Sequence, residues 1–107
     1  MSTQPPRSTI QAQAVQKVKT DMAHLVSLLN QYAGTSNKPN IAEVNVKHYM
    51  TELNEWFPKV ADARSWPPAE LQQWQRLWTT YQNGKGSWST MKQIATPLNS
   101  RVQQAEA

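Results

Sequence analysis

The sequence predicts an all-α fold, either a small antiparallel four-helix bundle or two packed helical hairpins. Three stretches of the chain place bulky apolar residues in alternating steps of three and four, which is the spacing of side chains along one face of an α-helix. Segments that contain proline and glycine separate these stretches, and no segment is expected to form a strand. The three apolar stripes are formed by Val15, Val18, Met22, Leu25, Leu29 and Tyr32, by Leu71, Trp74, Trp78 and Tyr81, and by Trp88, Met91, Ala95, Leu98, Val102 and Ala105.

The first helix is predicted over residues 9–33, after a flexible arm formed by residues 1–8. The arm contains two prolines and small polar residues, which contribute no apolar surface to a core. Ser8 or Thr9 can cap the start of the helix, and Gly34 is expected to end it in the left-handed conformation. A helix of about 25 residues is roughly 37 Å long.

The second helix is predicted over residues 41–57. Asn40 and Glu43 have the spacing of a capping box, in which the two side chains satisfy free backbone N–H groups at a helix start. Pro58 is expected either to end this helix or to begin a short extra turn that runs through Ala63, because proline is tolerated at the start of a helix.

The third helix is predicted over residues 68–83, after a boundary formed by two consecutive prolines. Pro68 disfavours the helical conformation at Pro67, so the helix is expected to begin at Pro68 itself. Glu70 then lies in the first turn, where a negative charge is favourable against the helix dipole.

The fourth helix is predicted over residues 88–102, with Ser87 as its cap. Pro97 either kinks this helix or divides it into two segments. Residues 104–107 are expected to fray, so the single helical domain spans residues 9–103.

The composition predicts a soluble protein with a weakly charged surface. Only 17% of the 107 residues are charged, and amide side chains are abundant, which lowers the cost of desolvation when another surface approaches. The net charge is +4, but the positive side chains are dispersed along the chain, so the sequence predicts no dedicated basic patch. The sequence has no cysteine and no apolar run of signal-peptide or membrane-spanning type. We therefore expect a protein made in the cytoplasm.

The sequence contains no pattern that is typical of a catalytic or cofactor site. Two histidines are paired along their helices with carboxylates, His24 with Asp21 and His48 with Glu52. A metal site needs three or four ligands, so ordinary surface histidines are the favoured interpretation. No nucleophile elbow or glycine-rich phosphate loop is present. We therefore expect neither an enzyme nor a bound cofactor or metal.

A long apolar stripe on a small protein favours a role in binding another protein. The first helix is longer than its neighbours require, so part of its stripe is expected to face a second copy or a different subunit. Tryptophans at a helix border or a proline-rich boundary are candidate anchors, since tryptophan is enriched in binding hot spots. The predicted partner-binding residues are Val18, Leu25, Leu29, Tyr32, Trp56 and Trp66. The sequence therefore predicts a non-enzymatic interaction module, such as a subunit of a phage or viral particle, a secretion-associated protein or an inhibitor.

Nucleic-acid binding is the alternative that the tryptophans allow. Single-stranded nucleic acid could stack on exposed indoles while basic side chains hold its phosphates. The candidate phosphate contacts are Lys59, Arg64, Arg76 and Lys85. Binding to a membrane surface is disfavoured, because the polar face of the third helix carries glutamines rather than lysine and arginine.

Overall fold

Four helices make up the computed structural model, which describes residues 7–34, 39–83 and 88–104, with side chains from residue 12 onward. They are α1 (Arg7–Tyr32), α2 (Asn40–Ala63), α3 (Pro68–Asn83) and α4 (Trp88–Gln104). The described residues contain no strand. The predicted all-α fold is confirmed.

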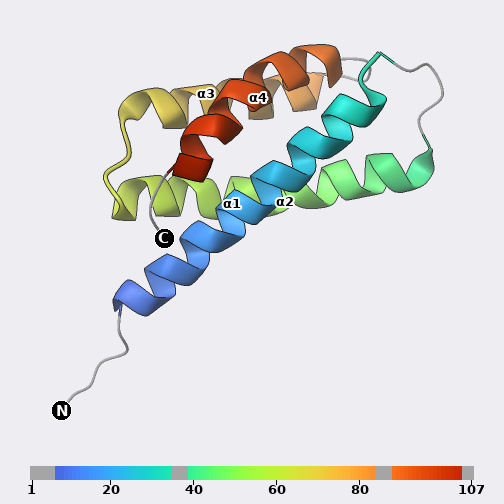
Figure 1. The fold of residues 1–107 in the computed structure, drawn as a ribbon. Coiled ribbons are helices and arrows are strands. Elements are labelled where there is room, and N and C mark those ends of the chain that lie inside the picture. Colours follow the sequence, from blue (N-terminus) through green and yellow to red (C-terminus); the bar gives the residue numbers. More distant parts are fainter. Residues whose placement is uncertain (1–6, 35–38, 84–87, 105–107) are drawn as a thin grey trace.

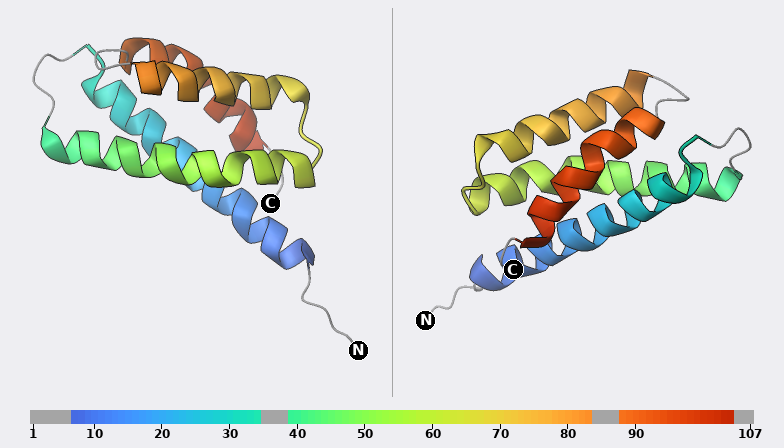
Figure 2. Two further views of the ribbon diagram at one scale, coloured as in Figure 1. Left: turned by 180° about the vertical axis from the view of Figure 1, so that it is seen from behind. Right: turned by 45° about the horizontal axis from the view of Figure 1, so that its top comes forward.

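Each helix packs against its neighbours in the sequence, and α4 also packs against α1, which closes a ring of four. Figure 1 and the left view of Figure 2 show that α1 crosses α2 obliquely. The side chains that α1 and α2 turn toward the core are buried along the whole length of the pair, from Val15 to Leu29 and from Ala42 to Val60.

A single apolar core lies inside the ring, and all four helices contribute to it. The described residues of the predicted stripes face this core, together with a stripe of α2, and Ala105 lies outside the described residues. The largest fully buried side chains are Trp74, Phe57, Met22, Leu25, Leu29, Met50, Leu53, Leu77, Met91, Leu98, Val15 and Val18. The stripe of α1 is therefore covered within one chain, by α2 and α4.

The limits of α1 differ slightly from those predicted. The helix begins at Arg7, so Ser8 and Thr9 lie inside it and the prediction that either residue caps it is wrong. The predicted arm consequently loses its last two residues to the helix, and residues 1–6 lie outside the described part of the chain. Gly34 has a φ of 85°, which confirms the predicted left-handed residue after the helix.

Helix α2 continues through Pro58 to Ala63 as one element. The predicted end at residue 57 is therefore wrong, and the helical conformation reaches Ala63, as the alternative expected, but without a new start at Pro58. Proline removes one helical hydrogen bond and typically costs about 3 kcal/mol inside a helix. Phe57 and Val60 are buried on either side of it, and their packing outweighs that local cost. The predicted capping box is also wrong, because Pro39 is the capping residue and no side-chain bond caps the helix.

The two C-terminal helices largely follow the prediction. Helix α3 begins at Pro68, as expected. Pro97 lies inside a single α4 that reaches Gln104, so it does not divide the helix. Leu98 and Val102, which follow this proline, are buried in the core and hold the last turns in place. The predicted cap at Ser87 and the tail beyond Gln104 lie outside the described residues.

Candidate functional site

The turn between α2 and α3 fixes the position of Trp66. Ser65 adopts a left-handed conformation with a φ of 53°. The Trp66 N–H donates to the Ala61 carbonyl at 2.9 Å, and the Ser65 N–H donates to the Asp62 carbonyl at 3.2 Å. These two bonds form a Schellman motif, which ends α2 and turns the following residue back toward it.

Trp66 packs against the core rather than standing free. Its ring meets Phe57 edge-on, with centroids 5.5 Å apart. Phe57 in turn stacks on Trp74 at the same separation, and Trp74 is buried. Trp66 thus clamps the turn and keeps only part of its indole exposed.

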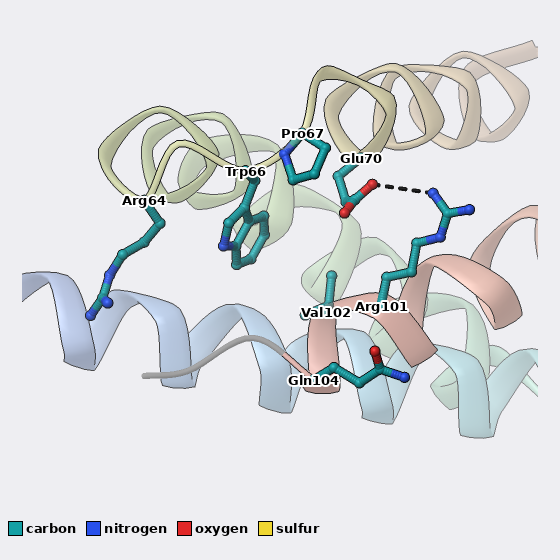
Figure 3. Close-up of a pocket in the computed structure, with 7 residues that line it drawn as sticks. All are labelled: Arg64, Trp66, Pro67, Glu70, Arg101, Val102 and Gln104. Carbon is teal, nitrogen blue, oxygen red and sulfur yellow. Dashed lines mark hydrogen bonds and ion pairs between the residues drawn. The ribbon is translucent and has the colours of Figure 1, made fainter.

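Beside Trp66, a cavity of ≈ 360 Å³ opens where the α2–α3 turn faces the end of α4 (Figure 3). Its polar wall contains an ion pair in which Arg101 Nη1 lies 3.2 Å from Glu70 Oε1. Glu70 matches the charge of Arg101, whereas no carboxylate in the lining matches that of Arg64. The cavity is lined by Arg64, Trp66, Pro67, Glu70, Arg101, Val102 and Gln104.

A second cavity, of ≈ 210 Å³, lies between α1 and α2 near the start of α1. Its walls are almost entirely apolar, and two basic side chains border them. The Lys59 Nζ atom lies 4.9 Å from the ring centroid of Trp56, a cation–π contact. The lining residues are Ala14, Val15, Trp56, Lys59, Val60, Ala63 and Arg64. We call this space the α1–α2 cavity.

Arg64 borders both cavities. Its Nε atom is buried and donates no hydrogen bond within the described part of the chain. A buried donor without an acceptor is costly, and the rest of the guanidinium group is the part of Arg64 that could meet a carboxylate or carbonyl oxygen. The α1–α2 cavity therefore combines an apolar space with basic groups, which suits an aliphatic side chain beside an acidic one.

Three of the predicted partner-binding residues are not available to a partner. Val18, Leu25 and Leu29 are each 0% exposed, so the prediction that they form a contact surface is wrong. The sequence showed that α1 carries a continuous stripe, but α2 and α4 together cover it from Val15 to Leu29.

Some of the remaining predicted residues line the two cavities, and the others lie elsewhere in the structure or outside the described residues. Trp56, Lys59 and Arg64 line the α1–α2 cavity, and Arg64 also meets Trp66 at the larger cavity. The others lie elsewhere or are not described: Tyr32 is half-buried at the far end of α1, Arg76 is exposed on α3, and Lys85 is outside the described residues.

A polar cluster lies at the crossing of α1 and α2. The Lys17 Nζ atom is 3.0 Å from Glu52 Oε1, and His48 Nε2 is 3.8 Å from Glu52 Oε2. Asp21 is only 7% exposed. Burial, and then the neighbouring Glu52, raise the pKa of Asp21 to about 6, whereas the hydrogen bond from Lys17 lowers the pKa of Glu52.

The two histidines near this cluster pack against a tyrosine. His24 and His48 both lie against Tyr49, with ring centroids 5.4 and 5.3 Å away. Among the described residues, no group of three potential ligands could hold a metal ion. The sequence showed the separate pairs on each helix, but not that Asp21 and Glu52 meet across the helix crossing.

Sequence reasoning also missed an exposed apolar pair. Ile41 is 62% exposed and Val44 is 59% exposed, and both lie in the first turns of α2. Neither residue belongs to the stripe that α2 turns to the core. Two large apolar residues outside that stripe were the sequence signal that could have predicted their exposure.

No protein-family model, curated protein or solved structure matches the chain. None of the helices within residues 7–34, 39–83 and 88–104 has the length and apolar character needed to cross a membrane.

Proposed function

We propose that this protein is a non-enzymatic helical interaction module that binds protein through the α1–α2 cavity. The observation that carries the proposal is an apolar cavity of ≈ 210 Å³ bordered by Trp56, Lys59 and Arg64. An apolar cavity of about 150 Å³ accommodates a benzene ring, so this space suits an aliphatic or aromatic side chain of a partner. A tryptophan beside a pocket and an arginine at its edge are typical of binding hot spots.

The position of the proposed surface differs from the one that the sequence suggested. Most of the apolar stripe of α1 is buried, so we propose the α1–α2 cavity as the binding surface instead. The small, weakly charged bundle remains suited to a subunit of a larger assembly, such as a phage or viral particle or a secretion-associated complex. We also propose that the protein is synthesised in the cytoplasm.

Affinity purification from the native source tests the proposal with a matched pair of variants. Ala63 and Ala69 are both exposed, but only Ala63 lines the cavity. We expect the tagged protein to retain a partner in stoichiometric amount, Ala63→Glu to lose it, and Ala69→Glu to keep it. Equal retention by both variants would place binding elsewhere.

Single-stranded nucleic acid is a second candidate ligand, favoured by one observation. Trp56, Lys59 and Arg64 lie together at one cavity, which supplies an indole for stacking and two cations for phosphates. Tryptophan fluorescence should then fall on addition of an oligonucleotide, and the effect should weaken as salt is raised. Fluorescence that does not change at low salt would exclude this candidate.

A further inference from the structure

Two carboxyl groups meet where α1 crosses α2, and one of them is buried. Asp21 is 7% exposed, and its Oδ2 atom is buried without a hydrogen-bond partner among the described residues. A charged oxygen in that position is costly, because nothing replaces the water that it loses. The group within hydrogen-bonding reach on α2 is Glu52, which cannot donate when it is charged. We call Asp21 and Glu52 the carboxyl pair.

The charges around the carboxyl pair come from α1 and α2. Lys17 lies one turn before Asp21 on α1, and its Nζ atom is 3.0 Å from Glu52 Oε1. His48 Nε2 lies 3.8 Å from Glu52 Oε2 and carries a charge only when it is protonated. His24, three residues after Asp21, packs against a tyrosine of α2. The pair is therefore one negative charge short of balance only when Asp21 is neutral and Lys17 alone is the partner of Glu52.

The other helix that packs against α1 brings an uncharged group to this region. Gln103 Nε2, on α4, donates to the Lys19 carbonyl oxygen at 2.7 Å. Of the charged side chains on α4, Arg101 pairs with Glu70 on α3, and Lys92 lies beside the far end of α1. Helix α3 packs against α2 and α4 rather than against α1. The protonation of Asp21 is therefore governed by burial and by the groups of the α1–α2 crossing.

The carboxyl pair lies next to the α1–α2 cavity. Ala14 on α1 and Trp56 on α2 line that cavity. Ala14 is about one turn before Lys17, and Trp56 is about one turn after Glu52. The Lys17–Glu52 contact therefore joins the two walls of the cavity at one end, and any separation of the helices at this contact moves those walls apart.

We propose that a single proton, held by the carboxyl pair, keeps α1 against α2, and that its loss lets the two helices separate beside the α1–α2 cavity. With the proton bound, the neutral carboxyl of Asp21 donates a hydrogen bond to Glu52, which also accepts one from Lys17. With the proton lost to solvent, two carboxylates face each other in a partly buried place. The inference rests on the proposed function, since it names how formation of the binding cavity is regulated.

The direction of the pH dependence follows from the environment of Asp21. Burial, and then Glu52, raise its pKa from 3.8 to about 6. Once the helices separate, Asp21 is in water and has its ordinary pKa, so the separated state binds the proton less tightly. The ratio of separated to closed molecules should therefore rise about tenfold between pH 5 and pH 8.

NMR of the side-chain carboxyl carbons in the intact protein tests whether the pair holds the proton. We expect the Asp21 signal to titrate with a midpoint near pH 6 and the Glu52 signal to respond over the same range. Glu52→Gln should lower the pKa of Asp21, because the amide can donate to its carboxylate. Glu55→Gln, at an exposed position of α2, should leave it unchanged. An Asp21 midpoint near 3.8 in the wild-type protein overturns the proposal.

Amide hydrogen exchange tests whether the helices separate. Protection of the Val15 and Val18 amides, corrected for the intrinsic effect of pH on exchange, should fall about tenfold from pH 5 to pH 8. Asp21→Asn carries a donor and no charge at either pH, so it should abolish this change. Asp62→Asn, at an exposed position, should show the wild-type change.

The urea dependence of the same exchange distinguishes separation of two helices from unfolding of the whole protein. Separation exposes less surface, so exchange at Val15 and Val18 should depend less on urea than exchange at Leu77 in α3. An equal urea dependence, or protection that does not change with pH, overturns the proposal.

Failure of this inference and failure of the proposed function give different results. Titration and exchange use the purified protein without a partner, whereas the proposed function is tested by the partner that Ala63→Glu loses. Protection that stays constant with pH, together with loss of a partner by Ala63→Glu, overturns the inference and leaves the proposed function standing. Protection that falls as expected, together with equal retention by Ala63→Glu and Ala69→Glu, supports the proton-dependent separation and overturns the cavity as the binding surface.

Discussion

Lys17 and Glu52 join α1 to α2 through a 3.0 Å contact between Nζ and Oε1. This bond raises the pKa of Lys17 and lowers the pKa of Glu52. It holds a negative charge beside the buried carboxyl of Asp21, whose Oδ2 has no hydrogen-bond partner among the described residues. The ion pair between Lys17 and Glu52 therefore stabilises the helix crossing, whereas the charged form of Asp21 beside Glu52 destabilises it.

Stability should fall as the pH rises from about 5 to 7. The pKa of Asp21 in the folded protein is about 6, above the ordinary value of 3.8, so the folded state binds this proton more tightly than the unfolded state does. Its contribution is present in full below the ordinary value and is lost as the pH passes the folded value. The lowered pKa of Glu52 acts in the opposite direction, but only below its ordinary value of 4.5. Thermal unfolding measured across this range checks the slope.

Asp21→Asn should raise stability above pH 7 and flatten this dependence. The amide carries no charge beside Glu52 and can donate a hydrogen bond to it. We expect a gain of about 1 kcal/mol, because solvent around the partly exposed Lys17 and Glu52 screens the repulsion. Asp62→Asn, at an exposed position, should keep the wild-type slope. An Asp21→Asn variant that is less stable than the wild type at pH 8 would contradict the expected repulsion.

Ser65→Gly should stabilise the protein by about 0.5–1 kcal/mol, because glycine adopts the left-handed conformation without the strain that a side chain introduces. The φ of Ser65 is 53°. Ser100→Gly, at an exposed site inside α4, should instead destabilise by about 0.5 kcal/mol through lost helix propensity. Urea unfolding midpoints should move in opposite directions for the two variants.

Trp66→Ala should destabilise the protein by about 2 kcal/mol, less than for a fully buried tryptophan, since part of the indole is exposed. The loss comes from the edge-on contact with Phe57. Trp66→Phe should retain most of the stability. If Trp66→Ala unfolds at the same urea concentration as the wild type, the indole does not clamp the turn.

Leu25→Ala should destabilise by about 2–5 kcal/mol, the usual cost of emptying a core site. Leu25 is 0% exposed. Ile41→Ala should change stability by no more than about 0.5 kcal/mol, because the side chain is exposed. Parallel chemical unfolding of the two variants distinguishes a core residue from a surface residue, and equal effects would contradict this assignment.

Part of the candidate site was predictable from local patterns. Trp56 lies at the border of an apolar stripe, and Lys59 follows one turn later, so their proximity was expected from helical spacing. Arg64 joins them at the α1–α2 cavity, and lines the larger cavity with Trp66, only because α2 continues past Pro58 and ends in a left-handed turn. The helix continues past Pro58 because Phe57 and Val60 are buried in the core. The residues near Pro58 in the sequence do not reveal that burial.

The sequence by itself determined that the chain forms helices, where α3 begins and where Gly34 ends α1, because periodicity and chain conformation act over a few neighbouring residues. Only the tertiary structure decided that Leu25 is covered while Ile41 is exposed, and that Asp21 meets Glu52. Burial and charge pairing depend on which distant surface reaches a side chain, and the oblique crossing of α1 over α2 sets that here.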